Sequence, residues 1–285
     1  MMGPAASSSR LQEWPPLCGS PKLMQPRQIL ETSRPVEPNL VYSTCVLLQL
    51  WTFQAPCLLY TSRPDPAPSV AESMARVAEI GLLPVVELPD LKLAEPLFEA
   101  LSAGGLPAAE ITLRTAAGLD GIRLLVEAFP TGFIGAGTVR SVEDAARVID
   151  AGARFVVCPG TDPELVAYCC ERQVLVMPGV CTPSEIQAAL RAGAAPLLKF
   201  FPAEPLGGVP FLKALAGPFG EVRFVPTGGI NAANLETYLS LPQVAACGGS
   251  WMVTKALLAE RDFVKIRDLT AQAVGIVAAS AVSRG

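Results

Sequence analysis

The sequence contains no histidine among its 285 residues. This absence excludes Ser-His-Asp and Cys-His catalytic arrangements, because both need an imidazole as the general base. It also excludes every zinc site that has a histidine ligand. A general base in this protein must therefore be a Glu, Asp, Lys, Tyr or Cys side chain.

Cysteine pairs at metal-binding or redox spacing are also missing. The eight cysteines include no C-x-x-C pair, and their spacings match neither a zinc knuckle nor a disulfide framework. We expect free, partly buried thiols in a reducing compartment, which points to a cytoplasmic protein.

Positive charge is scarce. The chain has 22 Lys and Arg residues against 26 Asp and Glu residues, so its formal net charge is −4. Nucleic acids and anionic membranes favour clustered Lys and Arg, so we expect neither of them as a partner. A small anionic substrate is compatible with this balance, because one or two local cations or a helix N-terminus can bind it.

Residues 1–73 differ in composition from the rest of the chain. They hold 11 of the 27 prolines, show no helical or strand period, and end near a linker-like segment, "SRPDPAPS" (62–69). The apolar stretch "VYSTCVLLQLWTF" (41–53) is shorter than the about 20 residues of a membrane span. No basic n-region or A-x-A site marks a secretory signal. We expect a disordered or non-native extension, with a targeting segment or a membrane or partner contact as alternatives, and a catalytic domain over 74–285 that opens at Met74.

Eight short apolar runs occupy the second part of the chain. They are rich in Val, Ile, Leu and Phe and are apolar on both faces, which is typical of parallel strands covered by helices. The runs span residues 82–88, 108–113, 133–139, 153–160, 174–180, 195–203, 222–229 and 244–250. Helical stretches lie between them; Ser141 is a predicted N-cap, and Pro183 and Ser184 mark another helix start.

Eight repeated βα units predict an α/β fold of the (β/α)8 TIM-barrel type. A doubly wound open sheet is the alternative. It is disfavoured because no G-x-G-x-x-G follows the first run and because the number of units reaches eight.

The carboxyl ends of barrel strands carry the active site, so residues there are candidates for catalysis. In "EITLRT", Glu110, Thr112 and Arg114 alternate and therefore share one face. In "KFFPAE", Lys199 and Phe201 share a face. A buried carboxylate needs a partner, and a lysine from another strand is a natural one; a purely structural ion pair is the alternative. Apolar neighbours favour the neutral amine, which attacks ketones to give a Schiff base.

Paired glycines end the seventh and eighth runs. Gly228 and Gly229 lie in "PTGGI", and Gly248 and Gly249 precede Ser250 in "CGGSW". Glycine lets the backbone N–H groups approach an anion closely, and barrels bind phosphate at this place. The alternative is that these residues only form tight turns.

These motifs together resemble the bacterial 2-dehydro-3-deoxy-6-phosphogluconate (KDPG) aldolases, a family that includes the 4-hydroxy-2-oxoglutarate (KHG) aldolases. The resemblance rests on "EITLRT", "GAGT", "KFFPAE", "GPFGEVRFVPTGGI" and "GGSWM", and it covers residues 76–280. It implies a metal-free class I aldolase on a TIM barrel, without a cofactor, usually a homotrimer, acting on a phosphorylated 2-keto acid.

The resemblance also implies roles for single residues. Lys199 corresponds to the Schiff-base lysine and Glu110 to the acid/base. The implied substrate-binding residues are Arg114 and Thr138 for the pyruvyl carboxylate, Pro159 and Phe201 for the pocket wall, and Thr227, Gly228, Gly229, Gly248, Gly249 and Ser250 towards the phosphate end. Glu87 departs from the apolar or basic residue that many members carry on the first strand, which bears on the preference for the distal anionic group.

The expected reaction is cleavage of KDPG to pyruvate and glyceraldehyde 3-phosphate, and also of KHG to pyruvate and glyoxylate. Three alternatives stay open at this point: an aldolase for the galactonate epimer of KDPG, another phosphate-binding barrel isomerase or synthase, and a non-catalytic barrel.

Overall fold

The computed structural model describes residues 68–282, so the predicted extension before Pro68, with its apolar stretch 41–53, lies outside the described residues. Helix α1 (Val70–Ile80) starts with a capping box. The Ser69 hydroxyl accepts the Glu72 backbone N–H, and the Glu72 carboxylate accepts the Ser69 backbone N–H. The predicted domain start at Met74 falls inside this helix, because the capping signal lies in the segment interpreted as a linker.

All eight apolar runs contain strands, and the described residues hold nine strands. They are β1 (Leu82–Val86), β2 (Ala108–Thr112), β3 (Phe133–Gly137), β4 (Phe155–Val157), β5 (Leu175–Met177), β6 (Gly179–Val180), β7 (Leu197–Phe200), β8 (Arg223–Pro226) and β9 (Cys247–Gly249). The fifth run forms two strands, β5 and β6, separated by Pro178, whose backbone has no N–H for the strand ladder.

The strands pair in parallel and close into a barrel. One sheet has the order β5-β4-β3-β2-β1-β9 and the other β6-β7-β8. Bridges between Phe224 and Val244 and between Thr227 and Gly248 join the two sheets beside β9, and the chain itself joins them from β5 to β6. The prediction of a TIM barrel is confirmed, and the doubly wound open sheet is not.

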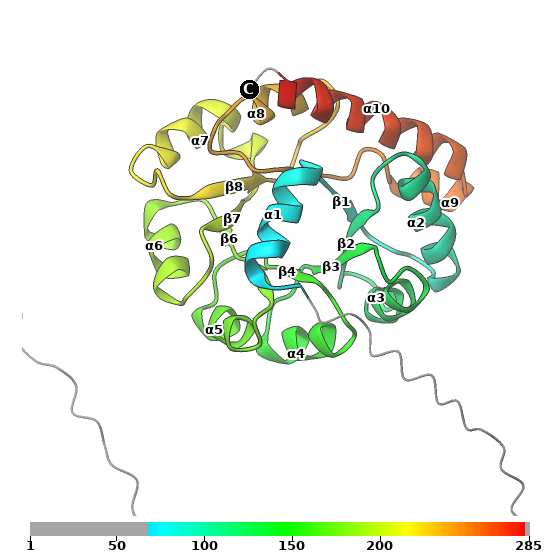
Figure 1. Cartoon of the computed structure of the whole chain (residues 1–285), viewed down its shortest axis with the longest axis horizontal. Helices are drawn as coiled ribbons and strands as arrows, with labels where there is room; N and C mark the ends of the chain where they lie inside the picture. The colour runs from blue at the N-terminus through cyan, green and yellow to red at the C-terminus, as the bar shows by residue number, and fades with distance from the viewer. Residues whose placement is uncertain (1–67, 283–285) are drawn as a thin grey trace, which may run out of the picture. The chain divides into compact units, whose positions relative to one another are not determined.

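Helices surround the strands as a ring (Figure 1). They are α2 (Ala94–Ala103), α3 (Ala117–Ala128), α4 (Val142–Asp150), α5 (Pro163–Glu171), α6 (Pro183–Arg191), α7 (Gly208–Ala216), α8 (Leu235–Leu239), α9 (Lys255–Glu260) and α10 (Phe263–Val282), with 3-10 turns at η1 (Leu91–Leu93) and η2 (Glu204–Leu206). No helix within residues 68–282 combines the length and the apolar character needed to span a membrane.

The helix starts follow local capping chemistry. Ser141 is the N-cap of α4, as predicted, and accepts the Asp144 N–H. For α6 the N-cap is Thr182, not Ser184, because Thr182 forms a capping box with Glu185 and Pro183 then occupies the first helical turn.

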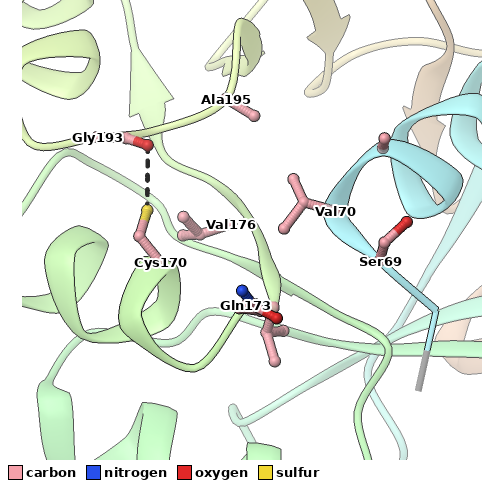
Figure 2. A pocket seen from close by; sticks show the side chains of 9 residues that line it. Ser69, Val70, Cys170, Gln173, Val176, Gly193 and Ala195 are labelled. Atoms are coloured by element: carbon pink, nitrogen blue, oxygen red, sulfur yellow. Dashed lines mark hydrogen bonds between the residues drawn. The ribbon is translucent and has the colours of Figure 1, made fainter. Parts of the chain in front are cut away.

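Helix α1 covers the amino ends of the strands, in contact with β1 and β5. A cavity of about 430 Å³ lies beside it, between Val70 on α1, Cys170 on α5 and the chain just before β5 and β7 (Figure 2). The Cys170 thiol donates a hydrogen bond to the Gly193 carbonyl across this cavity. Its lining carries no charged side chain.

Candidate active site

Lys199 on β7 and Glu110 on β2 meet inside the barrel near the carboxyl ends of the strands. The Lys199 Nζ atom lies 3.6 Å from the Glu110 Oε1 atom, and the side chains are only 8% and 3% exposed. The predicted pairing is therefore present. Glu110 Oε1 is buried and has no hydrogen-bond partner among the described residues. A buried carboxylate oxygen without a hydrogen bond is costly, so this oxygen can accept a hydrogen bond from a ligand.

Aromatic and thiol side chains surround the amine. Lys199 Nζ lies 5.1 Å from the ring centroid of Phe201, as the shared face predicts. The Cys158 thiol at the end of β4 is buried, and burial raises its pKa well above the usual range; the charges of Lys199 and Glu110 also act on it. This thiol therefore remains protonated and serves as a neutral part of the wall.

Glu110 fits its position because β3 presents a glycine beside it. A Cβ atom on Gly137 would lie 2.2 Å from Glu110 Oε1. In the β2–β3 register Glu110 pairs with Gly135 and Thr112 with Gly137. The buried Thr112 hydroxyl donates to the Val86 carbonyl at 2.9 Å, which anchors the end of β2 to β1.

An open cavity of about 480 Å³ lies at the mouth of the barrel. Its lining includes Arg114, Gly229 and Ser250 of the predicted substrate-binding set, together with Glu87 and Lys255. Arg114 follows β2 in a turn, its side chain is 49% exposed, and its Nη1 atom lies 3.9 Å from Glu87 Oε2. The Arg114 guanidinium makes no hydrogen bond to any described residue, so its donors are available to a carboxylate or phosphate.

The glycine pairs lie at the ends of β8 and β9, and of the four only Gly229 lines the mouth cavity. Gly228 and Gly229 have φ angles of 103° and 82°, which favour glycine. The Gly228 carbonyl accepts the Glu204 N–H. Thr227 is buried and forms a parallel bridge with Gly248 on the neighbouring strand.

Some predicted residues do not line the mouth cavity. The lining does not include Thr227, Gly228, Gly248, Gly249, Phe201, Lys199 or Glu110. Thr138 and Pro159 follow β3 and β4 and are not among the lining residues either. Thr138 has a φ of 59°, a conformation that a β-branched residue rarely adopts and that is often held at functional sites.

The sequence profile of the KDPG and KHG aldolases matches residues 73–269. The chain belongs to this family.

Named relatives in the family are similar over most of their own length. The chain is 43% identical over 209 residues to the 2-dehydro-3-deoxy-phosphogluconate aldolase of Treponema pallidum, covering 73% of this chain and 98% of that protein. It is 41% identical over 204 residues to the KHG/KDPG aldolase of Escherichia coli K12, covering 72% and 94%. A KDPG aldolase structure from Legionella pneumophila, with pyruvate captured as a covalent carbinolamine, has a TM-score of 0.68 at 41% identity, covering 70% and 96%.

The candidate residues predicted from the sequence do not include two residues of the mouth. Lys255, at the start of α9, and Trp251, after β9, both line the cavity. The Trp251 Nε1 atom is buried and has no hydrogen-bond partner among the described residues. The sequence "SWMVTK" could have indicated Lys255, because a cation five residues after the end of the eighth run lies near the carboxyl end of the barrel.

No group of three or more Cys, Asp or Glu side chains within the described range is arranged to hold a metal ion.

Proposed function

We propose that this protein is a class I aldolase that cleaves KDPG to pyruvate and glyceraldehyde 3-phosphate through a Schiff base on Lys199. Cleavage of KHG to pyruvate and glyoxylate is a second activity of the same site. Family membership and the relatives at 41–44% identity, which are named as KDPG or KHG/KDPG aldolases, support this function.

One observation carries the proposal. The buried Lys199 amine and Glu110 carboxylate lie 3.6 Å apart, and Glu110 Oε1 has no other partner among the described residues. A buried ion pair is a weak source of stability compared with apolar packing. Two enclosed ionisable groups in contact are instead what covalent catalysis with proton transfer requires.

The reaction follows from this pair. The neutral Lys199 amine attacks the C2 ketone, and the carbinolamine loses water to give a protonated imine. The imine accepts the electron pair of the C3–C4 bond as that bond breaks, while Glu110 takes the proton of the C4 hydroxyl and the aldehyde leaves. Glu110 then returns the proton to C3 of the enamine, and water hydrolyses the imine to release pyruvate and the free amine.

The ends of the substrate match the two sides of the site. Arg114 and Thr138 bind the pyruvyl carboxylate, with Pro159 and Phe201 walling the pyruvyl pocket. The phosphate is bound by backbone N–H groups near the glycine pairs and by the Ser250 hydroxyl.

Two alternatives find less support. A native KDPGal structure is 24% identical and has a TM-score of 0.65, which shows the same fold alone. Thiamine phosphate pyrophosphorylase from Pyrococcus furiosus, at 20% identity and a TM-score of 0.52, likewise shares only the fold. A phosphate-binding isomerase or synthase gives no role to a buried lysine beside Glu110.

The test is chemical trapping. Borohydride added with pyruvate should reduce the imine to a stable secondary amine, and peptide mass spectrometry should find the three-carbon adduct on Lys199. Lys199→Met should abolish the adduct and the cleavage activity, whereas Lys213→Met, which removes an exposed lysine in the last turn of α7, should change neither. An adduct on another lysine, or none at all, contradicts the proposal.

EDTA should leave the rate of KDPG cleavage unchanged, because the imine supplies the electron sink.

We also propose a homotrimer in the cytoplasm. The family resemblance supports the trimer, and Cys158, Cys169, Cys170 and Cys181, which are free thiols, support a reducing compartment. Light scattering of the purified chain tests the assembly: a mass of one or two chains contradicts it.

A further inference from the structure

The mouth cavity contains two charged side chains, Glu87 and Lys255, that the aldolase mechanism above does not use. Glu87, directly after β1, forms an ion pair with Lys255. The Lys255 Nζ atom lies 2.6 Å from the Glu87 Oε1 atom. The other carboxylate oxygen of Glu87 lies 3.9 Å from Arg114 Nη1. All three side chains line the cavity that also contains Gly229 and Ser250.

The two side chains of this ion pair differ in how far they are exposed to solvent. The Glu87 side chain is 28% exposed, whereas Lys255 is 77% exposed on a long, flexible stem. Lys255 is the first residue of α9, and the backbone there is fixed by the Thr254 hydroxyl, which accepts the Leu257 N–H. The base of Lys255 is therefore fixed at the cavity wall, and its ammonium group is free to change partners.

Lys255 lines the same cavity as Gly229 and Ser250 of the predicted phosphate end. It follows Ser250 and Trp251, and the buried Trp251 Nε1 atom has no hydrogen-bond partner among the described residues. A phosphate monoester carries about 1.5 to 2 negative charges at neutral pH, against one on the Glu87 carboxylate. Lys255 therefore gains electrostatic energy when it moves from Glu87 to a phosphate at comparable distance.

We propose that Lys255 is a specificity-determining residue that binds the terminal phosphate of the substrate, and that Glu87 holds its ammonium group at the mouth until the substrate enters. This inference rests on the aldolase function proposed above. It identifies the substrate class as 2-keto acids with a distal phosphate, in preference to the same acids without one.

The experiment compares kcat/KM for KDPG and for the same 2-keto acid without its phosphate. Lys255→Met should lower kcat/KM for KDPG about fivefold by raising KM, as expected for the loss of one exposed ionic contact. The ratio of kcat/KM for KDPG to kcat/KM for the acid without phosphate should fall by the same factor. Lys255→Arg should restore most of the ratio. Lys213→Met is the matched control, because α7 ends at the amino side of the barrel and the variant removes the same charge.

A ratio in Lys255→Met within twofold of the wild-type ratio overturns the inference. The trapping of pyruvate on Lys199 is measured on the same preparations. If the wild-type protein traps pyruvate and the ratio is unchanged, only the role of Lys255 fails. If the wild-type protein traps none, the proposed function fails and this inference fails with it.

A second measurement tests the role of Glu87. Glu87→Gln should lower KM for KDPG about threefold when Lys255 is present, because the ammonium group is released, and by a clearly smaller factor in the Lys255→Met background. Equal factors in both backgrounds would show that Glu87 acts on the substrate's charge directly and would overturn its role as the holder of Lys255.

Discussion

Glu110 and Gly137 lie so close that a side chain at position 137 would displace the carboxylate: a Cβ atom there would stand 2.2 Å from Glu110 Oε1 and 2.7 Å from Glu110 Cγ. The neighbouring strand therefore determines where the carboxylate lies. This contact gives a way to move the proposed acid/base without changing its chemistry.

Gly137→Ala should displace the Glu110 carboxylate and lower kcat by on the order of 10²-fold, since misplacement of a catalytic group by about 1 Å has effects of that size. Steady-state cleavage of KDPG measures the effect. Gly275→Ala is the control, because a new methyl group at that position in α10 would meet no atom within 4 Å. A kcat for Gly137→Ala equal to that of the control would show that Glu110 position does not matter.

The chemistry of Glu110 itself is tested by Glu110→Gln, which preserves the size of the side chain and removes its basicity. We expect kcat to fall by about 10²–10⁴-fold, the usual contribution of a general acid–base, while the Lys199 adduct still forms with pyruvate and borohydride over longer times. Glu127→Gln changes an exposed carboxylate on α3 and should have no effect. A variant that keeps more than a tenth of the wild-type kcat would assign proton transfer to another group.

The pairing of Lys199 with Glu110 could be predicted from the sequence because both residues interrupt apolar runs that must be strands. Alternation places Glu110 on the inward face, and the barrel brings the second and sixth runs to one interior. The positions after the strands were harder to predict. Lys255 lines the mouth because the turn after β9 places the start of α9 there, and no periodic pattern encodes the path of such a turn.

The sequence predicted the N-cap of α4 correctly but not that of α6. Ser141 and Thr182 are both followed three residues later by an acidic residue, but in the second case Ser184 also offers a hydroxyl. The structure selects Thr182 because Pro183 fits the first helical turn, where its missing N–H costs nothing. The same reasoning applied to Ser69 and Glu72 would have placed the start of α1 before Met74.

The thiols of the barrel should differ in reactivity in a fixed order. Burial raises the pKa of Cys169 to about 12 and that of Cys158 further, so both are protonated and shielded at pH 8. Cys170 and Cys181 are only partly buried, although burial also raises the pKa of each thiol. Iodoacetamide at pH 8 should alkylate Cys181 and Cys170 before Cys169 and Cys158, as followed by peptide mass spectrometry. In denaturant all four should react at similar rates; early alkylation of Cys158 in the native protein would contradict its burial.

The capping box of α6 makes part of the stability depend on pH. Burial raises the pKa of Glu185, but hydrogen bonds donated to its carboxylate by the backbone N–H groups of Cys181 and Thr182 outweigh this and lower it from 4.5. A lowered folded-state pKa means that the stabilisation is fully present above the unfolded-state pKa of 4.5. It is lost as the pH falls through the folded-state pKa.

Glu185→Gln should therefore lower the free energy of unfolding by about 0.5 kcal/mol at pH 7, a value at the low end for helix caps because the site is partly solvated. The difference from the wild-type protein should shrink as the pH is lowered below 4.5. Denaturant unfolding at pH 7 and at acidic pH measures it. Glu164→Gln, in the first turn of α5, removes a carboxylate whose side chain accepts no hydrogen bond from the described residues and isolates the effect of charge near a helix N-terminus. If Glu185→Gln destabilises the protein equally at both pH values, the ionised carboxylate is not the stabilising group, and the cap depends on the shape of the side chain alone.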